Sequence, residues 1–149
     1  MSVVFVDSNV LIYSQDATDP QKQTRARDWL AHLWRTRSGR ISFQVLREVY
    51  VNLTRHVAHP VPVSRARDLV RQFLEWNPRP EDRELFELAW KVESRFQLSW
   101  WDSMIIAAAQ LSSCRYLLSE DLGQDMRVND LRVISPFSTS WESLEQAPE

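Results

Sequence analysis

The stretch VVFVDSNVLIY, residues 3–13, joins an apolar run to a predicted helix through a single aspartate. Its apolar run from Val3 to Val6 predicts a short buried strand, and a helix is expected to begin near Ser8. Asp7 lies between the two, where the apolar strand ends. An aspartate at this position has two interpretations: it caps the following helix, or it belongs to a chemical site.

The rest of the chain alternates between predicted helices and strands. Helices are expected over residues 20–37, 43–57, 64–73, 81–95 and 99–111, and strands over residues 40–42, 74–76, 116–118 and 132–134. Asp19-Pro20 is typical of a helix start, and Ser64 and Ser99 are expected to be caps. The alternation predicts a three-layer α/β fold with a mainly parallel central sheet and helices on both faces. We expect one domain over residues 1–137 and a C-terminal tail over residues 138–149.

Composition excludes several classes of protein. The 149 residues contain two glycines, Gly39 and Gly123, so neither common glycine-rich phosphate loop can be formed. Cys114 is the one cysteine, which excludes an intrachain disulfide and a cysteine-rich zinc site. No apolar run approaches the roughly 20 residues of a membrane span, and the first residues lack the pattern of a secretory signal. We therefore expect a cytoplasmic protein.

Charge is distributed unevenly along the chain. Residues 22–71 carry 11 basic and 3 acidic side chains, whereas residues 72–149 carry 7 basic and 14 acidic ones. Of the 18 basic residues, 16 are arginines, whose planar guanidinium groups suit phosphate. The pattern favours binding of a polyanion beside a group of carboxylates. Arginines that merely cover exposed helix faces would give the same pattern, and the sequence leaves both interpretations open.

Two acids follow predicted strands. Asp7 ends the first strand, and Asp121 comes three residues after the strand over residues 116–118. The carboxyl ends of parallel strands meet at one edge of a sheet, where active sites of α/β proteins lie. We therefore expect Asp7 and Asp121 to share that edge, although Glu120 and Asp125 compete with Asp121 for the role.

Two further acids lie on predicted helices. Glu48 falls opposite the apolar stripe of its helix, which fits either a solvated surface residue or a residue facing a cleft. Asp102 stands three residues after Ser99, the spacing of a capping box. The helix that follows it is apolar on all sides over residues 104–109, so it is expected to be buried. A carboxylate so near the interior needs a strong partner, and a cation would supply one.

These residues resemble those of PIN-domain ribonucleases, specifically the VapC toxins of bacterial toxin–antitoxin systems. The resemblance extends from Val3 to about Phe137. It rests on five segments in order: FVDSNVLIY, ISFQVLREVYVNL, LSWWDSMIIAAAQ, YLLSEDL and RVISPF. It implies a PIN-like fold and a metal-dependent endoribonuclease whose acids are Asp7, Glu48, Asp102 and Asp121. Supporting positions match Asn9 and Ser119, and a further acid of the family falls near Asp125, where the register is ambiguous.

The resemblance also implies chemistry and partners. Carboxylates suit Mg²⁺ or Mn²⁺, and a metal-activated water would hydrolyse RNA in line, leaving a 5′-phosphate. Asp7 and Asp102 are expected to be the principal metal ligands, with Glu48 and Asp121 completing the site or orienting water. The family further implies a homodimer and a cognate antitoxin that masks the cleft.

Candidate RNA-binding residues come from the basic segment and from two tryptophans. Phosphate contacts are expected from the arginines that should flank the site: Arg35, Arg37, Arg40, Arg47 and Arg55. Trp100 and Trp101 directly precede Asp102 and could stack on bases. Packing in the core or in a dimer interface is the favoured interpretation of both indoles.

Two other functions are weighed against the ribonuclease. A phosphotransfer enzyme could use Asp7 as its nucleophile, but enzymes of the haloacid-dehalogenase type need an acid two residues later, where this chain has Asn9. A receiver domain needs a lysine at a late strand end, and Lys22 and Lys91 both lie in predicted helices. A non-catalytic nucleic-acid-binding module on the same fold is the second alternative.

Overall fold

Five strands form one sheet within residues 2–123 and 125–146, the part of the chain that the computed structural model describes. Strand β1 (Val4–Val6) pairs in parallel with β2 (Gly39–Arg40), the edge strand, on one side and with β3 (Tyr116–Leu118), the central strand, on the other. Beyond β3 lie β5 (Leu131–Ile134), also parallel, and the antiparallel β4 (Arg127–Val128). The sheet is therefore mainly parallel, as predicted, and the strand order is β2-β1-β3-β5-β4.

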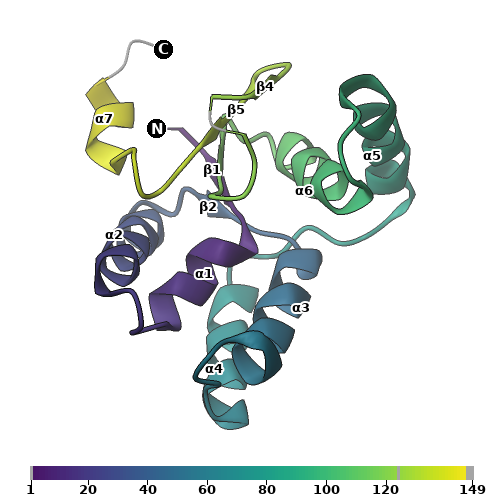
Figure 1. The fold of residues 1–149 in the computed structure, drawn as a ribbon. Helices are drawn as coiled ribbons and strands as arrows, with labels where there is room; N and C mark the ends of the chain where they lie inside the picture. Colours follow the sequence, from purple (N-terminus) through teal and green to yellow (C-terminus); the bar gives the residue numbers. More distant parts are fainter. Residues whose placement is uncertain (1, 124, 147–149) are drawn as a thin grey trace.

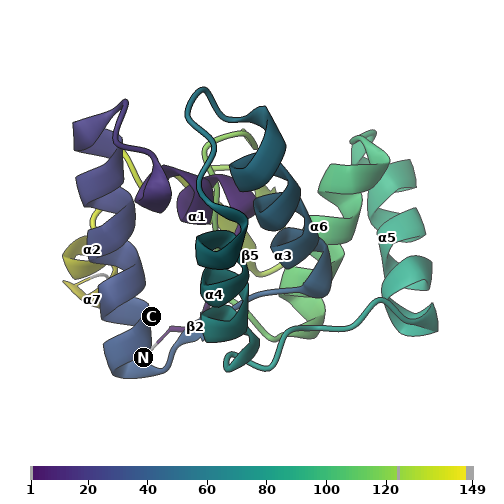
Figure 2. The same cartoon turned by 90° about the horizontal axis from the view of Figure 1, so that it is seen from below.

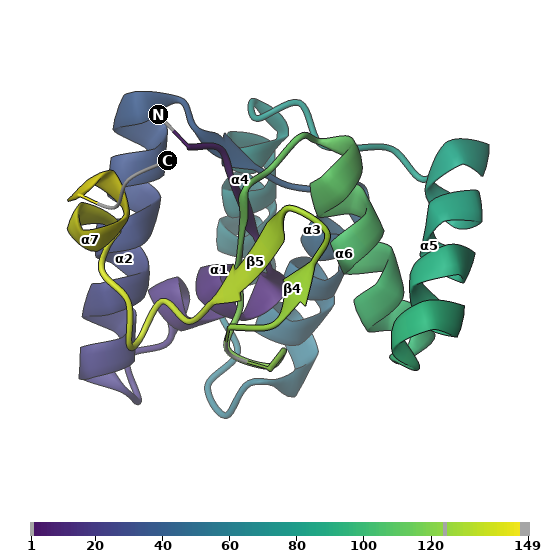
Figure 3. The ribbon, with the colours of Figure 1, turned by 90° about the horizontal axis from the view of Figure 1, so that it is seen from above.

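Helices flank this sheet on both sides (Figure 1). Helices α2 and α7 lie on one side of it, and α5 and α6 lie on the other (Figure 3). Helices α3 and α4 form a third group, which is nearest the viewer in Figure 2, and α1 packs against both α2 and α3. The three-layer α/β prediction is confirmed. The helices are α1 (Ser8–Gln15), α2 (Pro20–Thr36), α3 (Phe43–Val51), α4 (Val63–Leu74), α5 (Arg83–Phe96), α6 (Trp100–Leu111) and α7 (Trp141–Gln146).

Side-chain caps fix where three helices begin. The Asp7 carboxylate caps α1, and the Asp19 carboxylate accepts a hydrogen bond from the backbone of Lys22 at the start of α2. The Ser99 hydroxyl accepts from the backbone of Asp102 in α6. Residues 103–109 of α6 are all buried, which confirms the buried helix predicted from its apolar composition.

Some predicted boundaries are wrong. Residues 74–76 are not a strand, because Leu74 ends α4 and the next residues form a turn. Ser64 is not a cap, since α4 already begins at Val63. The helix expected over residues 43–57 is α-helical only to Val51 and continues as a π-helix, η1 (Asn52–His56).

Two elements in the last quarter of the chain were not predicted. Strand β4 forms a hairpin with β5. Helix α7 lies within the segment expected to be a tail, and it packs on α2. Its Trp141 ring stacks on His32 with 4.1 Å between the ring centroids, and its indole N–H donates to Asp28 at 3.0 Å. Across residues 2–123 and 125–146, no helix has the length and apolar character required to cross a membrane.

Candidate metal centre

Asp7 lies at the carboxyl edge of the sheet, between β1 and α1. Its backbone N–H donates to the carbonyl of Leu118 at 3.0 Å, which holds the end of β1 against the end of β3. Its side chain is only 7% exposed. One carboxylate oxygen, Oδ1, accepts from the N–H of Ser8 at 2.7 Å, and the other, Oδ2, accepts from the Ser119 hydroxyl at 2.8 Å. Both oxygens of the buried carboxylate are therefore held in fixed directions.

Asn9 connects this carboxylate to Asp121. Its Nδ2 lies 3.4 Å from Oδ2 of Asp7, 3.3 Å from the hydroxyl of Ser119 and 3.2 Å from Oδ2 of Asp121. Its Oδ1 accepts from the backbone N–H of Glu120 at 3.2 Å. One side-chain amide thus binds the first turn of α1 to the loop after β3. The structure brings together Asp7 and Asp121, as their positions after strands predicted, with Asn9 and Ser119 between them.

The electrostatic environment of Asp7 places Glu48 in the same region. Burial raises the pKa of Asp7 from 3.8 to about 6, and the hydrogen bonds from Ser119 and Ser8 oppose that shift. The negative charges of Glu48 and Asp121 raise the same pKa further. Glu48 on α3 is half-buried and its charge acts on Asp7 at the carboxyl edge of the sheet, which favours the interpretation that it faces a cleft.

Gln44 links Glu48 to the start of α6. Its Nε2 donates to Oε1 of Glu48 at 3.1 Å and to the backbone carbonyl of Trp101 at 3.4 Å. The next residue is Asp102, which is half-buried in the first turn of α6. Gln44 is buried and was not predicted to have a role. A usable signal was its position one helical turn before Glu48, where the two side chains share a face.

Asp7, Glu48, Asp102 and Asp121 form no ion pair with a basic side chain of the described residues. The two acids that competed with Asp121 for its role each form one. Glu120 pairs with Lys22, and Asp125 pairs with Arg132. Glu48 and Asp121 thus leave negative charge uncompensated around buried Asp7, and a bound cation would relieve it. Within the described chain, no three His, Cys, Asp or Glu side chains converge to enclose a metal ion. An open site with one or two protein carboxylates suits Mg²⁺, which keeps several waters and binds substrate phosphate.

Asp125 lies outside this network. Its side chain is exposed, its backbone has a φ of 60°, and its carboxylate accepts from Nε of Arg132 at 3.1 Å. Among the residues that the structure describes, its hydrogen bonds lead to β5 and not to Asp7. Asp125 is therefore held beside the β4–β5 hairpin.

Lys22 is a basic residue near the site that the sequence did not point to. Its ammonium group pairs with Glu120, lies 3.3 Å from the hydroxyl of Tyr13, and stands 4.8 Å and 5.0 Å from the ring centroids of Tyr13 and Phe137. It therefore fixes the loop after β3 against the first turn of α2.

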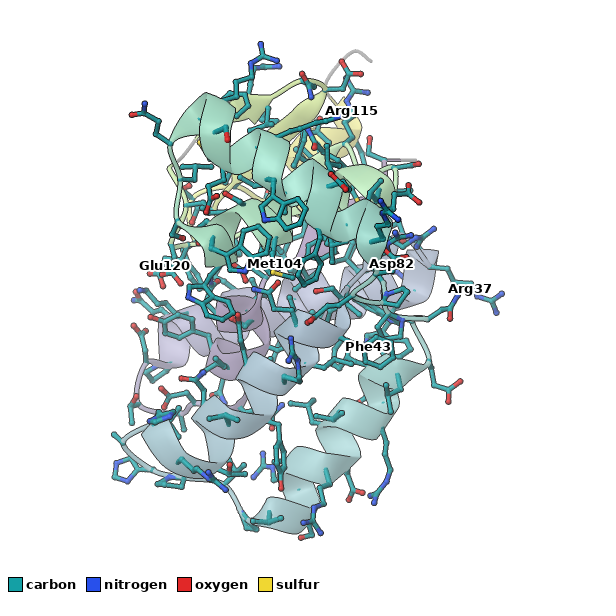
Figure 4. All side chains as sticks on the ribbon, turned by 90° about the vertical axis from the view of Figure 1, so that its right-hand side faces the viewer. Arg37, Phe43, Asp82, Met104, Arg115 and Glu120 are labelled. Carbon is teal, nitrogen blue, oxygen red and sulfur yellow. The ribbon has the colours of Figure 1, made fainter. Side chains whose placement is uncertain are left out.

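The predicted arginines divide into two groups. Helix α2 runs antiparallel to the strands, so its last turn lies at the amino edge of the sheet. Arg40 is close enough to Cys114, which precedes β3, to oppose the rise that burial causes in the pKa of that thiol. Figure 4 shows Arg37 and Glu120 on opposite sides of the molecule. The expectation that all five flank the site is wrong for the amino-edge arginines, which are Arg35, Arg37 and Arg40.

The other two predicted arginines follow the course of α3. Arg47 pairs with Glu81, and Arg55 is exposed on η1. Both belong to the same helical run as Glu48. Of the five predicted arginines, these two remain candidates for phosphate contacts, because the helical run that carries them also carries Glu48.

Comparison with known proteins agrees with this fold. The PIN domain family model matches residues 4–126. Among solved structures, the Mycobacterium tuberculosis toxin VapC20, which cleaves the sarcin–ricin loop, is similar with a TM-score of 0.56 and 22% identity, covering 76% of this chain and 86% of that one. A Klebsiella pneumoniae toxin–antitoxin complex is similar with a TM-score of 0.57 and 16% identity, covering 93% of this chain and 100% of that one. No curated protein matches the sequence. With its family model matched over most of its length, the chain belongs to the PIN domain family.

Proposed function

We propose that this protein is a metal-dependent endoribonuclease, the toxin of a toxin–antitoxin pair of the VapC type. The observation that carries the proposal is the group of unpaired acids at the carboxyl edge, in which Asn9 binds Asp7 and Asp121 together. Membership of the PIN domain family supports a nuclease. The metal, the substrate and the roles of single residues belong to the proposal.

Each residue has a part in the proposed reaction. Asp7 and Asp102 would hold Mg²⁺ or Mn²⁺ from β1 and α6, and Glu48 and Asp121 would complete the site or orient water. When bound, the cation supplies an activated water and stabilises negative charge on the phosphate. Asn9 and Ser119 keep the Asp7 carboxylate in one orientation.

Partners are proposed from likeness to the two toxin structures. One of them is a toxin that cleaves an RNA loop, and the other is a toxin in complex with an antitoxin. By analogy, this protein would act on RNA in the cytoplasm, form a homodimer and be inhibited by an antitoxin that covers the acid site. Arg47 and Arg55 are the predicted phosphate contacts that lie on the helical run of Glu48.

The deciding experiment incubates the purified protein with structured RNA and Mg²⁺ or Mn²⁺, with and without chelator. Cleavage should require the metal and should be lost in Asp7→Asn and Asp102→Asn. The matched control is Asp130→Asn, which removes an exposed carboxylate from the turn between β4 and β5. Cleavage that persists in chelator or in both site variants would refute the proposal. A phosphoryl group on Asp7 would identify a phosphotransfer enzyme, and metal-independent RNA binding without cleavage would identify a non-catalytic module.

A further inference from the structure

Two large indoles are exposed beside α6, and their surroundings differ. Trp90 on α5 is 49% exposed, and its ring contacts Phe86 and Trp100 at centroid distances of 6.0 and 6.2 Å. Trp101 is 64% exposed, and within residues 2–123 and 125–146 it makes no ring contact. The exposure of Trp90 is therefore the outer side of a packed aromatic cluster. Core packing accounts for Trp100 but not for Trp101.

Trp101 borders the acid site directly. It precedes Asp102 in the first turn of α6, and its carbonyl accepts from the Gln44 amide that also binds Glu48. The amide fixes the backbone of Trp101 against α3 while the indole stays open to solvent. A polymer whose phosphate lies at Asp102 would have an adjacent residue near the start of α6, where this indole is exposed.

We propose that Trp101 is a specificity-determining residue that stacks on an unpaired base adjacent to the phosphate that is cleaved. The proposal rests on the proposed function, since it takes the acids as the place where the phosphate binds. An indole stacks on any base because every base has a π face. A base inside a duplex already has neighbours on both faces, so only an unpaired base can use the indole.

The charges around the indole favour a nucleotide over a second copy of this chain. A second copy seated on Trp101 would also approach the half-buried carboxylates of Asp102 and Glu48, and burying carboxylates without a basic partner is costly. A bound nucleotide does not displace a cation from those carboxylates, because its phosphate binds to the same cation. Stacking therefore accounts for an exposed apolar ring next to unpaired acids, whereas a dimer interface does not.

The test measures binding of a short oligoadenylate that contains one 2-aminopurine, whose fluorescence is quenched when it stacks on an indole. Ca²⁺ replaces Mg²⁺ so that an oxygen-bound cation is present. Trp101→Ala should raise the Kd by about 5- to 150-fold and remove the quenching. Trp101→Phe should keep most of both. The matched control Trp90→Ala removes an exposed indole that is already packed, and its Kd should stay within about twofold of the wild-type value.

Several outcomes overturn the inference. Unchanged affinity and quenching in Trp101→Ala would do so, as would a wild-type protein that binds the duplex as tightly as the single strand. A dimer that dissociates in sedimentation only when Trp101 is replaced would assign the indole to a second copy. Failure of the proposed function would give a different result. The RNA would bind and its 2-aminopurine fluorescence would be quenched through Trp101, but the protein would show no metal-dependent cleavage that Asp102→Asn abolishes.

Discussion

Replacing Asp7 with asparagine should stabilise the metal-free protein at neutral pH while it abolishes the proposed activity. Burial raises the pKa of this carboxyl from 3.8 to about 6. Each tenfold change in acidity is worth about 1.4 kcal/mol, so the ionised carboxylate lowers the free energy of unfolding by about 3 kcal/mol above pH 6. Asparagine carries no charge, and therefore Asp7→Asn removes this cost.

The substitution also weakens the hydrogen bonds of Asp7. An asparagine oxygen can still accept from the N–H of Ser8, but the amide nitrogen cannot accept from the hydroxyl of Ser119 or from Nδ2 of Asn9. Each lost hydrogen bond costs about 1 kcal/mol. The net gain is about 1 kcal/mol, which corresponds to a rise of about 2–4 °C in the melting temperature of a chain of this size.

The pH dependence separates this explanation from a general stabilisation. The folded state holds a proton on Asp7 up to about pH 6, whereas the unfolded state loses it near pH 3.8. The cost of the ionised group therefore grows as the pH rises through this window, and the advantage of Asp7→Asn should disappear as the pH falls toward 4. Thermal unfolding in chelator at several pH values measures the difference in stability between Asp7→Asn and the wild type. Asp130→Asn is the control for loss of a charge.

Two results would refute the reasoning. One is an Asp7→Asn variant that is less stable than the wild type at neutral pH. The other is a stabilisation of equal size at pH 4 and above pH 6. Adding Mg²⁺ supplies a further check, because a cation that binds the folded state should raise the melting temperature of the wild type and leave that of the variant unchanged.

Four further predictions concern residues beside the site and residues away from it. Asn9→Ala releases Asp121 from Asp7 and should reduce metal affinity or cleavage by about 10- to 100-fold with little change in fold. Gln44→Leu leaves Glu48 without its amide partner and should lower the free energy of unfolding by about 1–3 kcal/mol, as measured in urea. Replacing the three amino-edge arginines with glutamine should leave RNA affinity within about threefold, because they lie away from the acids. Trp141→Ala should lower the melting temperature through loss of its stacking while cleavage is retained.

The sequence sufficed where a residue's place depends on regular geometry. Asp7 and Asp121 were placed at one edge of the sheet because both follow parallel strands. Asp102 was placed near the interior because the helix that it begins is apolar all round. In each case a local sequence pattern predicted the helix or strand and its place in the fold, and the position of the acid in that element then predicted where the carboxylate lies.

Other features depend on contacts between distant segments. The amino-edge arginines were misplaced because nearness in sequence to Glu48 says nothing about the edge at which α2 ends. Gln44 was missed because one of its partners is a backbone carbonyl on α6, which no pattern near residue 44 reveals. Helix α7 was missed because a helix of 6 residues is stable only through the packing of Trp141 on α2.

The contact between Lys22 and Glu120 has a mechanical consequence. Glu120 is held twice: its N–H donates to Asn9, and its carboxylate binds Lys22 on α2. Helix α2 has 17 residues, so it is a rod of about 25 Å whose far end carries the stack between His32 and Trp141. The loop that presents Asp121 is therefore anchored to one end of a rigid helix whose other end is held by α7. The anchor at Lys22 does not involve Trp141, so the loop stays attached to α2 when that stack is lost.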